Sequence, residues 1–271
     1  MLIVGELINA SRKSVAEAIE ARDSETVGRL AADQVAAGAG YVDVNAGIFQ
    51  DQEVELLSWL VETVQKTTSG APCSLDSPNP AAIEAAWSVH QGTPMINSIS
   101  LEKERYDALL PLIQGASCRV VALCMSDEGM PETCDQRMRI AERLIHGLTA
   151  AGMALEDIFL DPLVQPVGTN TQYAVEFLET VERIMETWPG VHTLCGMSNV
   201  SYGLPNRAFI NETFLAMAVA RGLDGAILNP LDTRIMARLV AAEMLIGRDA
   251  FCMDYLKAHR AGKLDGAARS L

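Results

Sequence analysis

Short apolar segments alternate with longer amphipathic segments along this chain, and that alternation limits the folds that it can adopt. Runs of four to eight mainly apolar residues predict strands, and the stretches of eleven or more residues between them have the apolar spacing of helices. A strand followed each time by a helix is typical of parallel βαβ units. We expect eight strands, at Leu2–Asn9, Tyr41–Ala46, Pro72–Ser77, Pro94–Ser98, Arg119–Met125, Ile158–Asp161, His192–Asn199 and Gly225–Asn229.

The predicted helices are bounded by residues that favour helix ends. Glycine, which readily adopts the left-handed conformation found after a helix, follows all of them, from Gly38 to Gly247. Asn79, which precedes Pro80, and Asp232 have side chains that cap helix N-termini. We expect helices at Ser14–Ala37, Gln52–Thr68, Pro80–Gln91, Glu102–Gln114, Asp135–Ala151, Thr171–Thr187, Phe209–Arg221 and Thr233–Ile246.

The number of these units points to a closed barrel. Eight βα units within 271 residues match the size of a TIM barrel. A doubly wound sheet more often carries a G-x-G-x-x-G loop after its first strand, where this chain reads N-A-S-R at 9–12. We therefore predict a single (β/α)8 TIM-barrel domain over residues 1–271. The tail after Phe251 fits none of the predicted units.

The composition excludes several classes of function. The formal net charge is −14 and no basic run is present, so we expect no nucleic-acid partner. No apolar run approaches the roughly 18 residues of a membrane span, and the N-terminus lacks the features of a signal peptide. We expect a cytoplasmic protein without a membrane partner. The six cysteines form no C-x-x-C pair, which favours reduced thiols.

The carboxyl ends of the predicted strands are the candidate site, because a barrel of this kind carries its active site at that face. Histidine and lysine are absent from these ends, which disfavours zinc or iron held by histidine as well as Schiff-base chemistry. The loops after the last two strands also lack a glycine-rich phosphate cradle. The ends read Glu6 and Asn9; Asp43 and Asn45; Asp76 and Ser77; Asn97 and Ser98; Ser126 and Asp127; Asp161; Ser198 and Asn199; and Asn229.

Carboxylate and amide side chains at these ends suit a flat, neutral and polar heterocycle. Asp accepts hydrogen bonds from ring N–H groups, and Asn both donates and accepts. Asp76, Asn97 and Asp161 lie on different strands and could converge on the edge of a pterin or a similar ring. The alternative is that each Asp only caps the helix that follows it.

A second polar set comes from the first two strands. Asp43 and Asn45 are two residues apart, so both face the same side of one strand. With Glu6 they form either a second polar wall or a set of ligands for a hard cation such as Mg²⁺. The spacing shows no dedicated metal cluster, and we expect no metal.

These polar residues lie in eight ordered segments: G-E-L-I-N (5–9), D-V-N-A-G (43–47), L-D-S (75–77), M-I-N-S (95–98), D-P-L (161–163), G-M-S-N-V-S (196–201), N-R (206–207) and N-x-T-F-L-A-M-A (211–218). Together they resemble the pterin-binding methyltransferase family, and most closely the methyltetrahydrofolate:corrinoid methyltransferases of anaerobic one-carbon metabolism. The likeness covers nearly the whole chain, from Met1 to about Asp254. It implies a barrel that binds a pterin.

The resemblance implies a role for the polar residues at the strand ends. Asp76, Asn97 and Asp161 would hydrogen-bond the pterin ring and fix its orientation. Asn199 would lie beside N5, the atom that carries the methyl group, and would be the catalytic residue. Glu6 would support the wall of the pterin site.

The segment around Asn199 has further residues with implied roles. Ser198 and Gly196 would shape that loop. Arg207 would hold either the loop or the aminobenzoyl part of the folate. Residues 202–205, Tyr-Gly-Leu-Pro, are less polar than the stretch expected in the corrinoid/iron–sulfur branch, which leaves the partner and the direction of transfer open.

The resemblance also implies the reaction. A methyl group would pass between N5 of tetrahydrofolate or 5-methyltetrahydrofolate and the cobalt of a corrinoid. No histidine of this chain lies in a D-x-H-x-x-G context, so cobalamin or another corrinoid would arrive in trans, free or on a transient corrinoid protein partner. Members of the family are typically homodimers, and we expect the same here.

Other functions remain open from the sequence. A dihydropteroate synthase-like condensing enzyme shares the barrel and the pterin pocket but needs basic residues for a pyrophosphate leaving group. The last strand end, A-I-L-N-P-L-D at 226–232, contains no Lys or His. A folate-binding subunit without catalysis and a metal-dependent enolase-type barrel are the further alternatives.

Overall fold

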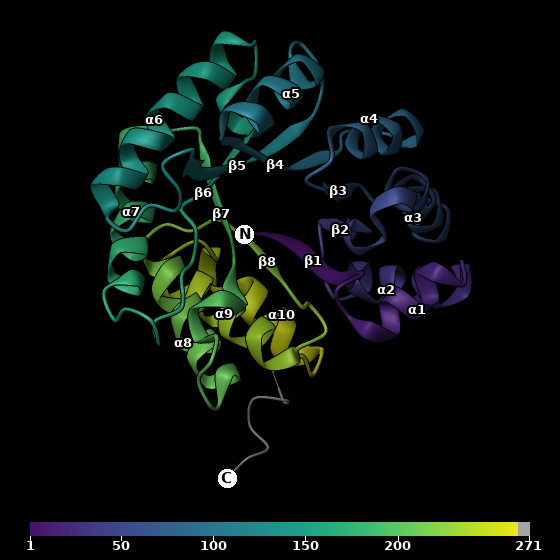
Figure 1. Ribbon diagram of the computed structural model, residues 1–271. Coiled ribbons are helices and arrows are strands. Elements are labelled where there is room, and N and C mark those ends of the chain that lie inside the picture. The colour runs from purple at the N-terminus through teal and green to yellow at the C-terminus, as the bar shows by residue number, and fades with distance from the viewer. Residues whose placement is uncertain (265–271) are drawn as a thin grey trace.

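Eight parallel strands form a closed barrel in chain order, which confirms the predicted (β/α)8 fold (Figure 1). The computed structural model describes residues 1–264. The barrel closes where β8 pairs with β1, with Leu2 opposite Gly225 and Gly5 opposite Leu228. The strands are β1 (Leu2–Asn9), β2 (Tyr41–Asn45), β3 (Cys73–Asp76), β4 (Met95–Leu101), β5 (Arg119–Ser126), β6 (Ile158–Asp161), β7 (His192–Gly196) and β8 (Gly225–Leu228).

Helices surround the barrel (Figure 1), and within residues 1–264 four 3₁₀ helices lie in the connections between elements. The α-helices are α1 (Lys13–Glu20), α2 (Ser24–Ala36), α3 (Glu53–Thr67), α4 (Pro80–Val89), α5 (Lys103–Ile113), α6 (Cys134–Ala150), α7 (Tyr173–Thr187), α8 (Arg207–Ala220), α9 (Thr233–Leu245) and α10 (Met253–Arg260). The 3₁₀ helices are η1 (Gly47–Gln52), η2 (Leu155–Asp157), η3 (Met197–Ser201) and η4 (Ala250–Cys252).

Local signals in the sequence predicted most helix ends. Asn79 and Asp232 accept hydrogen bonds from backbone N–H groups at the starts of α4 and α9, as their side chains favour. The eight glycines that follow predicted helices all have positive φ, between 69° and 110°. Such a conformation is open to glycine without steric cost and ends a helix after its last turn.

The predicted helix over Ser14–Ala37 is wrong, because the structure divides it into α1 and α2. Arg22 takes a positive φ of 50°, and the Asp23 side chain then accepts hydrogen bonds from the N–H groups of Glu25 and Thr26. This cap starts a new helix, whereas apolar spacing alone continues through the break.

Two strands end three residues away from their predicted ends, whereas the ends of the other strands agree with the prediction to within one residue. β4 continues past Ser98 to Leu101. β7 ends at Gly196 rather than Asn199, and the chain then enters the 3₁₀ helix η3. The last part of the predicted strand is therefore a turn at the carboxyl end of the barrel.

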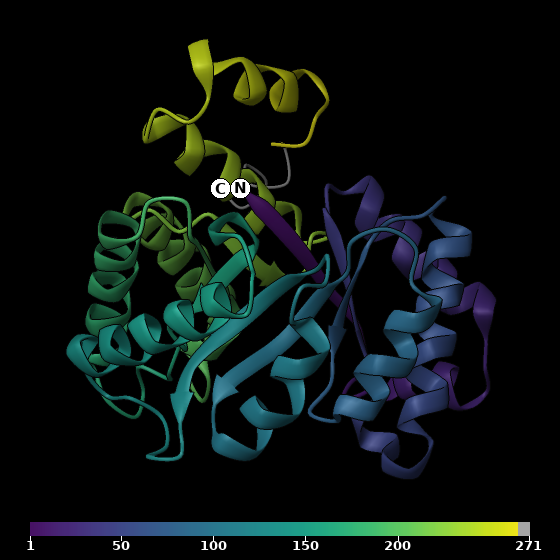
Figure 2. The same cartoon turned by 90° about the horizontal axis from the view of Figure 1, so that it is seen from above.

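Apolar packing fills the barrel and leaves one end for polar side chains. A buried cluster inside the barrel takes one residue from each of six strands: Val4, Tyr41, Met95, Val121, Phe159 and Leu194. In Figure 2 the strand arrows point away from the side that holds the N-terminus and the yellow C-terminal helices. Figure 1 therefore looks onto the carboxyl ends of the strands.

The chain after the last barrel helix forms η4 and α10, so the part of the tail that begins at Phe251 is helical up to Arg260. Residues 265–271 of that tail lie outside the described residues. None of the helices within 1–264 is long and apolar enough to cross a membrane. All six cysteines are free; five are buried, and Cys252 is exposed.

Candidate functional site

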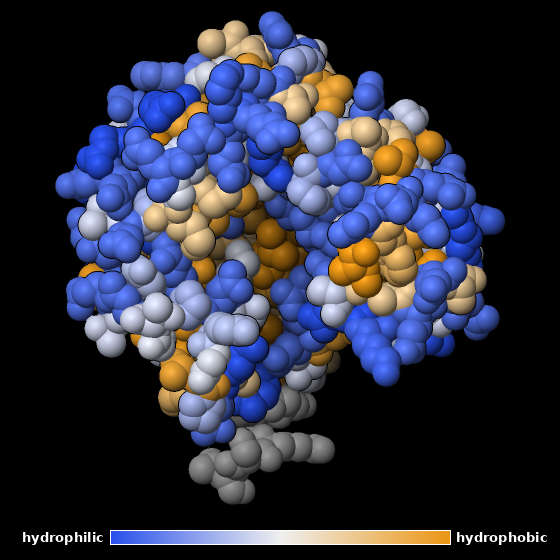
Figure 3. Space-filling view, in the orientation of Figure 1, coloured by the Kyte–Doolittle hydropathy of each residue, from blue (hydrophilic) through white to orange (hydrophobic). Residues whose placement is uncertain are grey.

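The carboxyl face of the barrel is hollowed at its centre. Figure 3 views this face and shows apolar residues at the floor of the hollow and hydrophilic residues around much of its rim. The predicted residues come to this face from different elements. Glu6, Asp76, Asn97 and Asp161 lie on β1, β3, β4 and β6, and Asn199 lies in η3.

Asp76 and Asn97 are opposite each other in the register of β3 and β4. Both side chains bond back to β2. Asn45 Nδ2 donates to Asp76 Oδ2 at 2.9 Å, and Asn97 Nδ2 donates to Asp43 Oδ1 at 3.1 Å. Asp43 and Asn45 are therefore part of the same polar network as Asp76 and Asn97, not a wall that is separate from them.

Two carboxyl groups of this network share one buried region. Burial and the negative charge of Asp76 raise the pKa of Asp43 well above its ordinary value, although Ser74 Oγ donates to Asp43 Oδ1 at 2.6 Å. Burial also raises the pKa of Asp76, which the hydrogen bond from Asn45 and the charge of Arg105 oppose. Two like charges this close disfavour double ionisation, so the pair readily holds a proton.

Asp161 is the most isolated carboxyl group of the site. Its side chain is 7% exposed, and burial raises its pKa to about 7. Oδ1 accepts from the N–H of Leu163 at 2.8 Å, in a turn where Leu163 has a φ of 65°. Within residues 1–264 no donor reaches Oδ2. One oxygen is thus used by the turn and the other is left for a ligand.

The alternative that these Asp residues cap the following helices is wrong. Asn79 caps α4, which follows Asp76. The helix after Asp161 begins only at Tyr173, twelve residues further along the chain. The placement of Asp76 and Asp161 at the barrel mouth is thus not explained by helix capping.

Asn199 is exposed within η3, and Arg207 fixes the turn around it. Arg207 Nη2 donates to the Ser198 carbonyl at 2.7 Å, and its Nε donates to Ser201 Oγ at 3.0 Å. Among the described residues the Asn199 side chain has no hydrogen-bond partner. The expected contact of Arg207 with the loop is therefore present, and a contact with the aminobenzoyl part of folate stays a prediction.

Gly196 is not required by backbone strain or by packing. Its φ of −75° and ψ of 111° suit any residue, and a Cβ placed on it would meet no atom within 4 Å. The glycine therefore keeps open a space at the end of β7. This space is next to the loop that carries Ser198 and Asn199.

Glu6 lies on β1, which only β2 separates from β3 and Asp76 in the order of the strands. Arg12 Nη2 pairs with Glu6 Oε1 at 2.9 Å. Burial raises the pKa of Glu6, and the charges of Arg12 and Arg207 oppose that rise. A cavity of about 210 Å³ adjoins Glu6 and Ser198, and Asn211 of α8 contributes to its lining.

No metal centre is formed by the residues that the structure describes. Positions 1–264 hold no group of three or more His, Cys, Asp or Glu side chains placed for one ion. Glu6 bonds to Arg12, and Asn45 bonds to Asp76. The residues considered for Mg²⁺ are thus engaged with different partners.

Sequence reasoning missed two of the three arginines that support this face. Arg105, Arg137 and Arg207 lie on α5, α6 and α8, and each donates to a backbone carbonyl beside a predicted site residue. Only Arg207 was expected, through the N-R segment. The other two lie within helices, where a charged residue has no local pattern that separates it from a solvated surface residue.

Known proteins are similar to the chain over most of its length. Residues 5–229 match the family described as "Pterin binding enzyme". The methylcorrinoid:tetrahydrofolate methyltransferase of Eubacterium limosum is 32% identical over 266 residues, covering 97% of this chain and 98% of that protein. The methionine synthase of Mycobacterium tuberculosis is 29% identical over 262 residues, covering 92% of this chain but 22% of that protein.

Solved structures share the fold at lower identity. Dihydropteroate synthase of Coxiella burnetii in complex with pteroic acid has a TM-score of 0.70 at 19% identity, covering 92% of this chain and 94% of that chain. The Xanthomonas albilineans enzyme in complex with 7,8-dihydropteroate has a TM-score of 0.69 at 21% identity, covering 90% and 91%. The family match over residues 5–229 and the Eubacterium limosum relative show that this chain belongs to the pterin-binding enzyme family.

Proposed function

We propose that this protein is a methyltransferase that moves a methyl group between N5 of tetrahydrofolate and the cobalt of a corrinoid. The similarity to the Eubacterium limosum enzyme along nearly the full length of both chains carries this proposal. By analogy with that methylcorrinoid:tetrahydrofolate methyltransferase, we favour transfer from a methylated corrinoid to tetrahydrofolate. The acidic and amide side chains at the barrel mouth are of the kind that this substrate requires.

The polar residues at the mouth match the chemistry of a pterin ring. The ring presents N–H donors on one edge, and a buried carboxylate accepts from such donors. Asp161 has a free oxygen for this purpose, and Asp76 and Asn97 lie side by side on neighbouring strands. We propose that these three side chains orient the ring in the mouth.

We propose that Asn199 acts at N5. A neutral amide can donate to N5 or orient its lone pair, and a hydrogen bond that strengthens as the C–N bond breaks or forms lowers the barrier to transfer. The turn held by Arg207 would present this side chain. Gly196 and Ser198 would leave room for the folate beside it.

The corrinoid would be a second substrate that a separate protein delivers. When bound, it supplies a cobalt centre that gives or takes the methyl group. None of the four histidines lies in a D-x-H-x-x-G sequence, which supports delivery in trans. The hollow of the carboxyl face would receive this transient partner, and we further propose that the enzyme acts as a homodimer.

The activity is tested by anaerobic absorbance spectroscopy of methylcobalamin mixed with tetrahydrofolate and the protein. We expect the methylcobalamin spectrum to disappear at a rate proportional to the concentration of the protein. Asn199→Ala is expected to slow that rate by about 10²-fold or more while the variant remains folded. Unchanged turnover in this variant would contradict the role of Asn199 but leave the reaction established.

The reverse reaction is tested with methyltetrahydrofolate and cob(I)alamin. If no transfer occurs in either direction, a folate-binding titration follows. Tight binding without any transfer, repeated with a corrinoid protein, would favour a folate-binding subunit without catalysis. A dihydropteroate synthase-like activity is tested separately by product formation from a pterin pyrophosphate and 4-aminobenzoate. We expect none, because residues 226–232 offer no basic side chain for pyrophosphate.

A further inference from the structure

Arg105 donates hydrogen bonds to the backbone directly after two of the proposed pterin-binding residues. It lies on α5 and is half-buried. Its Nε donates to the Ser98 carbonyl at 2.7 Å, and its Nη2 donates to the Ser77 carbonyl at 3.2 Å. Ser77 directly follows Asp76, and Ser98 directly follows Asn97. One guanidinium group thus bonds both to the residue after β3 and to a residue within β4.

We infer that Arg105 is a positioning residue for tetrahydrofolate, holding Asp76 and Asn97 at a fixed spacing and supplying a positive charge beside them. This inference rests on the proposed function. These two backbone segments also bond to each other directly, because the Ser77 N–H donates to the Asn97 carbonyl at 3.1 Å. Consecutive Cα atoms are only about 3.8 Å apart. A shift of the Ser77 and Ser98 carbonyls would therefore also shift Asp76 and Asn97.

The charges around Asp76 give the guanidinium a second effect. Asp43 of β2 and Glu53 at the start of α3 are the acidic groups that face Asp76, and Arg105 of α5 faces it with positive charge. Glu102, which precedes α5, faces Arg105 in turn. Arg105 therefore opposes the burial that favours protonation of Asp76, and so favours the ionised form of this side chain, which only accepts hydrogen bonds.

The same arrangement recurs at another strand end. Arg137 of α6 is fully buried, and its Nε donates at 2.7 Å to the carbonyl of Pro162, the residue after Asp161. The charge of Arg137 lowers the pKa of Asp161 against the effect of burial. Each of the three proposed ring ligands is thus followed by a backbone carbonyl that accepts a hydrogen bond from a helix arginine. This recurrence favours a common positioning role over a chance surface contact.

The experiment compares Arg105→Met, which removes the charge and the donors, with Arg105→Lys, which keeps the charge but lacks the forked donor. Arg119→Met is the matched control, because Arg119 lies at the other end of the barrel over the rings of Tyr41 and Phe159. Tetrahydrofolate affinity, KM and kcat are measured for each folded variant. The pKa of Asp76 is followed in the free protein by ¹³C NMR with labelled aspartate, assigned by signal loss in Asp76→Asn.

We expect Arg105→Met to raise the pKa of Asp76 by about 1 and to weaken tetrahydrofolate binding by about 10-fold, seen in KM more than in kcat. Arg105→Lys should keep the pKa of Asp76 near that of the wild type but weaken binding by about 3-fold. Arg119→Met should change neither. If Arg105→Met does not fold, the Arg105→Lys affinity decides alone.

Wild-type affinity in every folded Arg105 variant would overturn the inference. So would a pKa of Asp76 that is the same in Arg105→Met as in the wild type. Failure of the wild-type protein itself to bind tetrahydrofolate would instead count against the proposed function. The NMR measurement separates these cases, since it needs no folate.

Discussion

At the scale of the residue, Asp161 carries a charge that the folded barrel disfavours. Its pKa is raised to about 7 by burial, whereas an unfolded chain ionises this group near pH 4. The folded state therefore binds a proton that the unfolded state has lost between these values. By linkage, the contribution of this group to stability falls as pH rises from about 4 to about 7, and stays low above that.

Asp161→Asn removes this titration while keeping an acceptor for the Leu163 N–H. We expect the variant to be more stable than the wild type at pH 8, by on the order of 2–4 kcal/mol, and equally stable below about pH 4. Denaturant unfolding at several pH values checks this. The matched control is Asp23→Asn, because Asp23 is exposed and its hydrogen bonds to Thr26 lower its pKa. A pH-independent difference for Asp161→Asn would contradict the argument.

The same group governs the pH dependence of binding. Ring N–H groups bond more strongly to an ionised carboxylate than to a neutral one. We expect wild-type tetrahydrofolate affinity to rise as pH increases through about 7, and Asp161→Asn to bind weakly without this dependence. Titrations between pH 6 and pH 8 measure it. If Asp161 binds the pterin ring as proposed, the stability lost at this residue serves that binding.

At the scale of the element, β1 depends on a side chain of α2. The pairing of β1 with β2 shifts between Gly5 and Ile8, so the Leu7 N–H leaves the ladder. Gln34 Oε1 accepts this N–H at 3.0 Å, and the Gln34 side chain is fully buried. A Cβ at Gly5 would lie 2.5 Å from the same Oε1. Gly5 therefore leaves room for Gln34 Oε1, which accepts the Leu7 N–H next to Glu6.

Gly5→Ala is expected to destabilise the protein by about 1–3 kcal/mol, because Gln34 must move and its bond to Leu7 weakens. Gly196→Ala is the matched control for stability, since a Cβ there meets nothing within 4 Å. Thermal or denaturant unfolding compares the two. Equal stability of both variants would mean that the Gln34 side chain moves at no cost. The close packing of Gln34 against Gly5 would then not constrain β1.

These elements also mark how far the sequence predicts the structure. Apolar spacing and glycine positions predicted all eight strands, because both depend on neighbours along the chain. Parallel strands end at one face, so Asp76, Asn97 and Asp161 could be grouped without coordinates. The contact of Gln34 with Leu7 spans 27 residues, and that of Arg105 with Ser77 spans 28. Such contacts leave no local signal, and sequence reasoning missed them.

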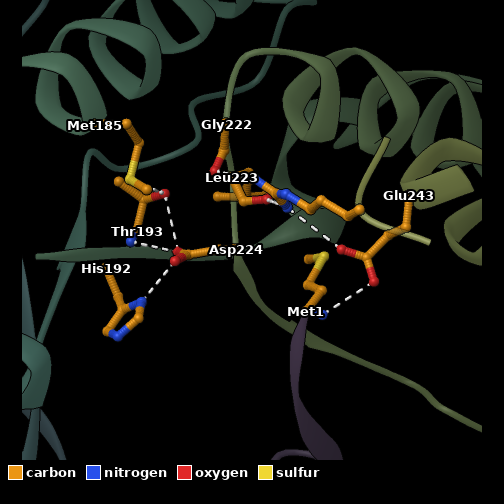
Figure 4. A network of polar contacts seen from close by, with 9 residues as sticks. Met1, Met185, His192, Thr193, Gly222, Leu223, Asp224 and Glu243 are labelled. Atoms are coloured by element: carbon orange, nitrogen blue, oxygen red, sulfur yellow. Dashed lines mark hydrogen bonds and ion pairs between the residues drawn. The ribbon is translucent and has the colours of Figure 1, made fainter. Parts of the chain in front are cut away.

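At the scale of the whole molecule, we expect the two ends of the barrel to have different roles. Figure 4 shows polar contacts at the N-terminal end, where the strand starts of β1, β7 and β8 meet α9. Asp224 Oδ1 accepts from the Thr193 N–H at 2.8 Å, and the Asp224 carbonyl accepts from the Leu2 N–H at 2.7 Å. Arg248 Nη1 donates to the Leu223 carbonyl at 2.8 Å. This network ties together the strands at which the barrel closes.

Asp224→Ala tests that division of tasks. Loss of the acceptor leaves the N–H of buried Thr193 and the His192 ring without their partner, and we expect about 1–3 kcal/mol of lost stability. Because the proposed folate site lies at the opposite face, tetrahydrofolate affinity and kcat should stay at wild-type values well below the melting temperature. Asn199→Ala should give the reverse, with normal stability and slow transfer. Weakened folate binding in stable, folded Asp224→Ala would mean that the two ends are coupled through β7 and β8, and that closure of the barrel itself sets the geometry of the site.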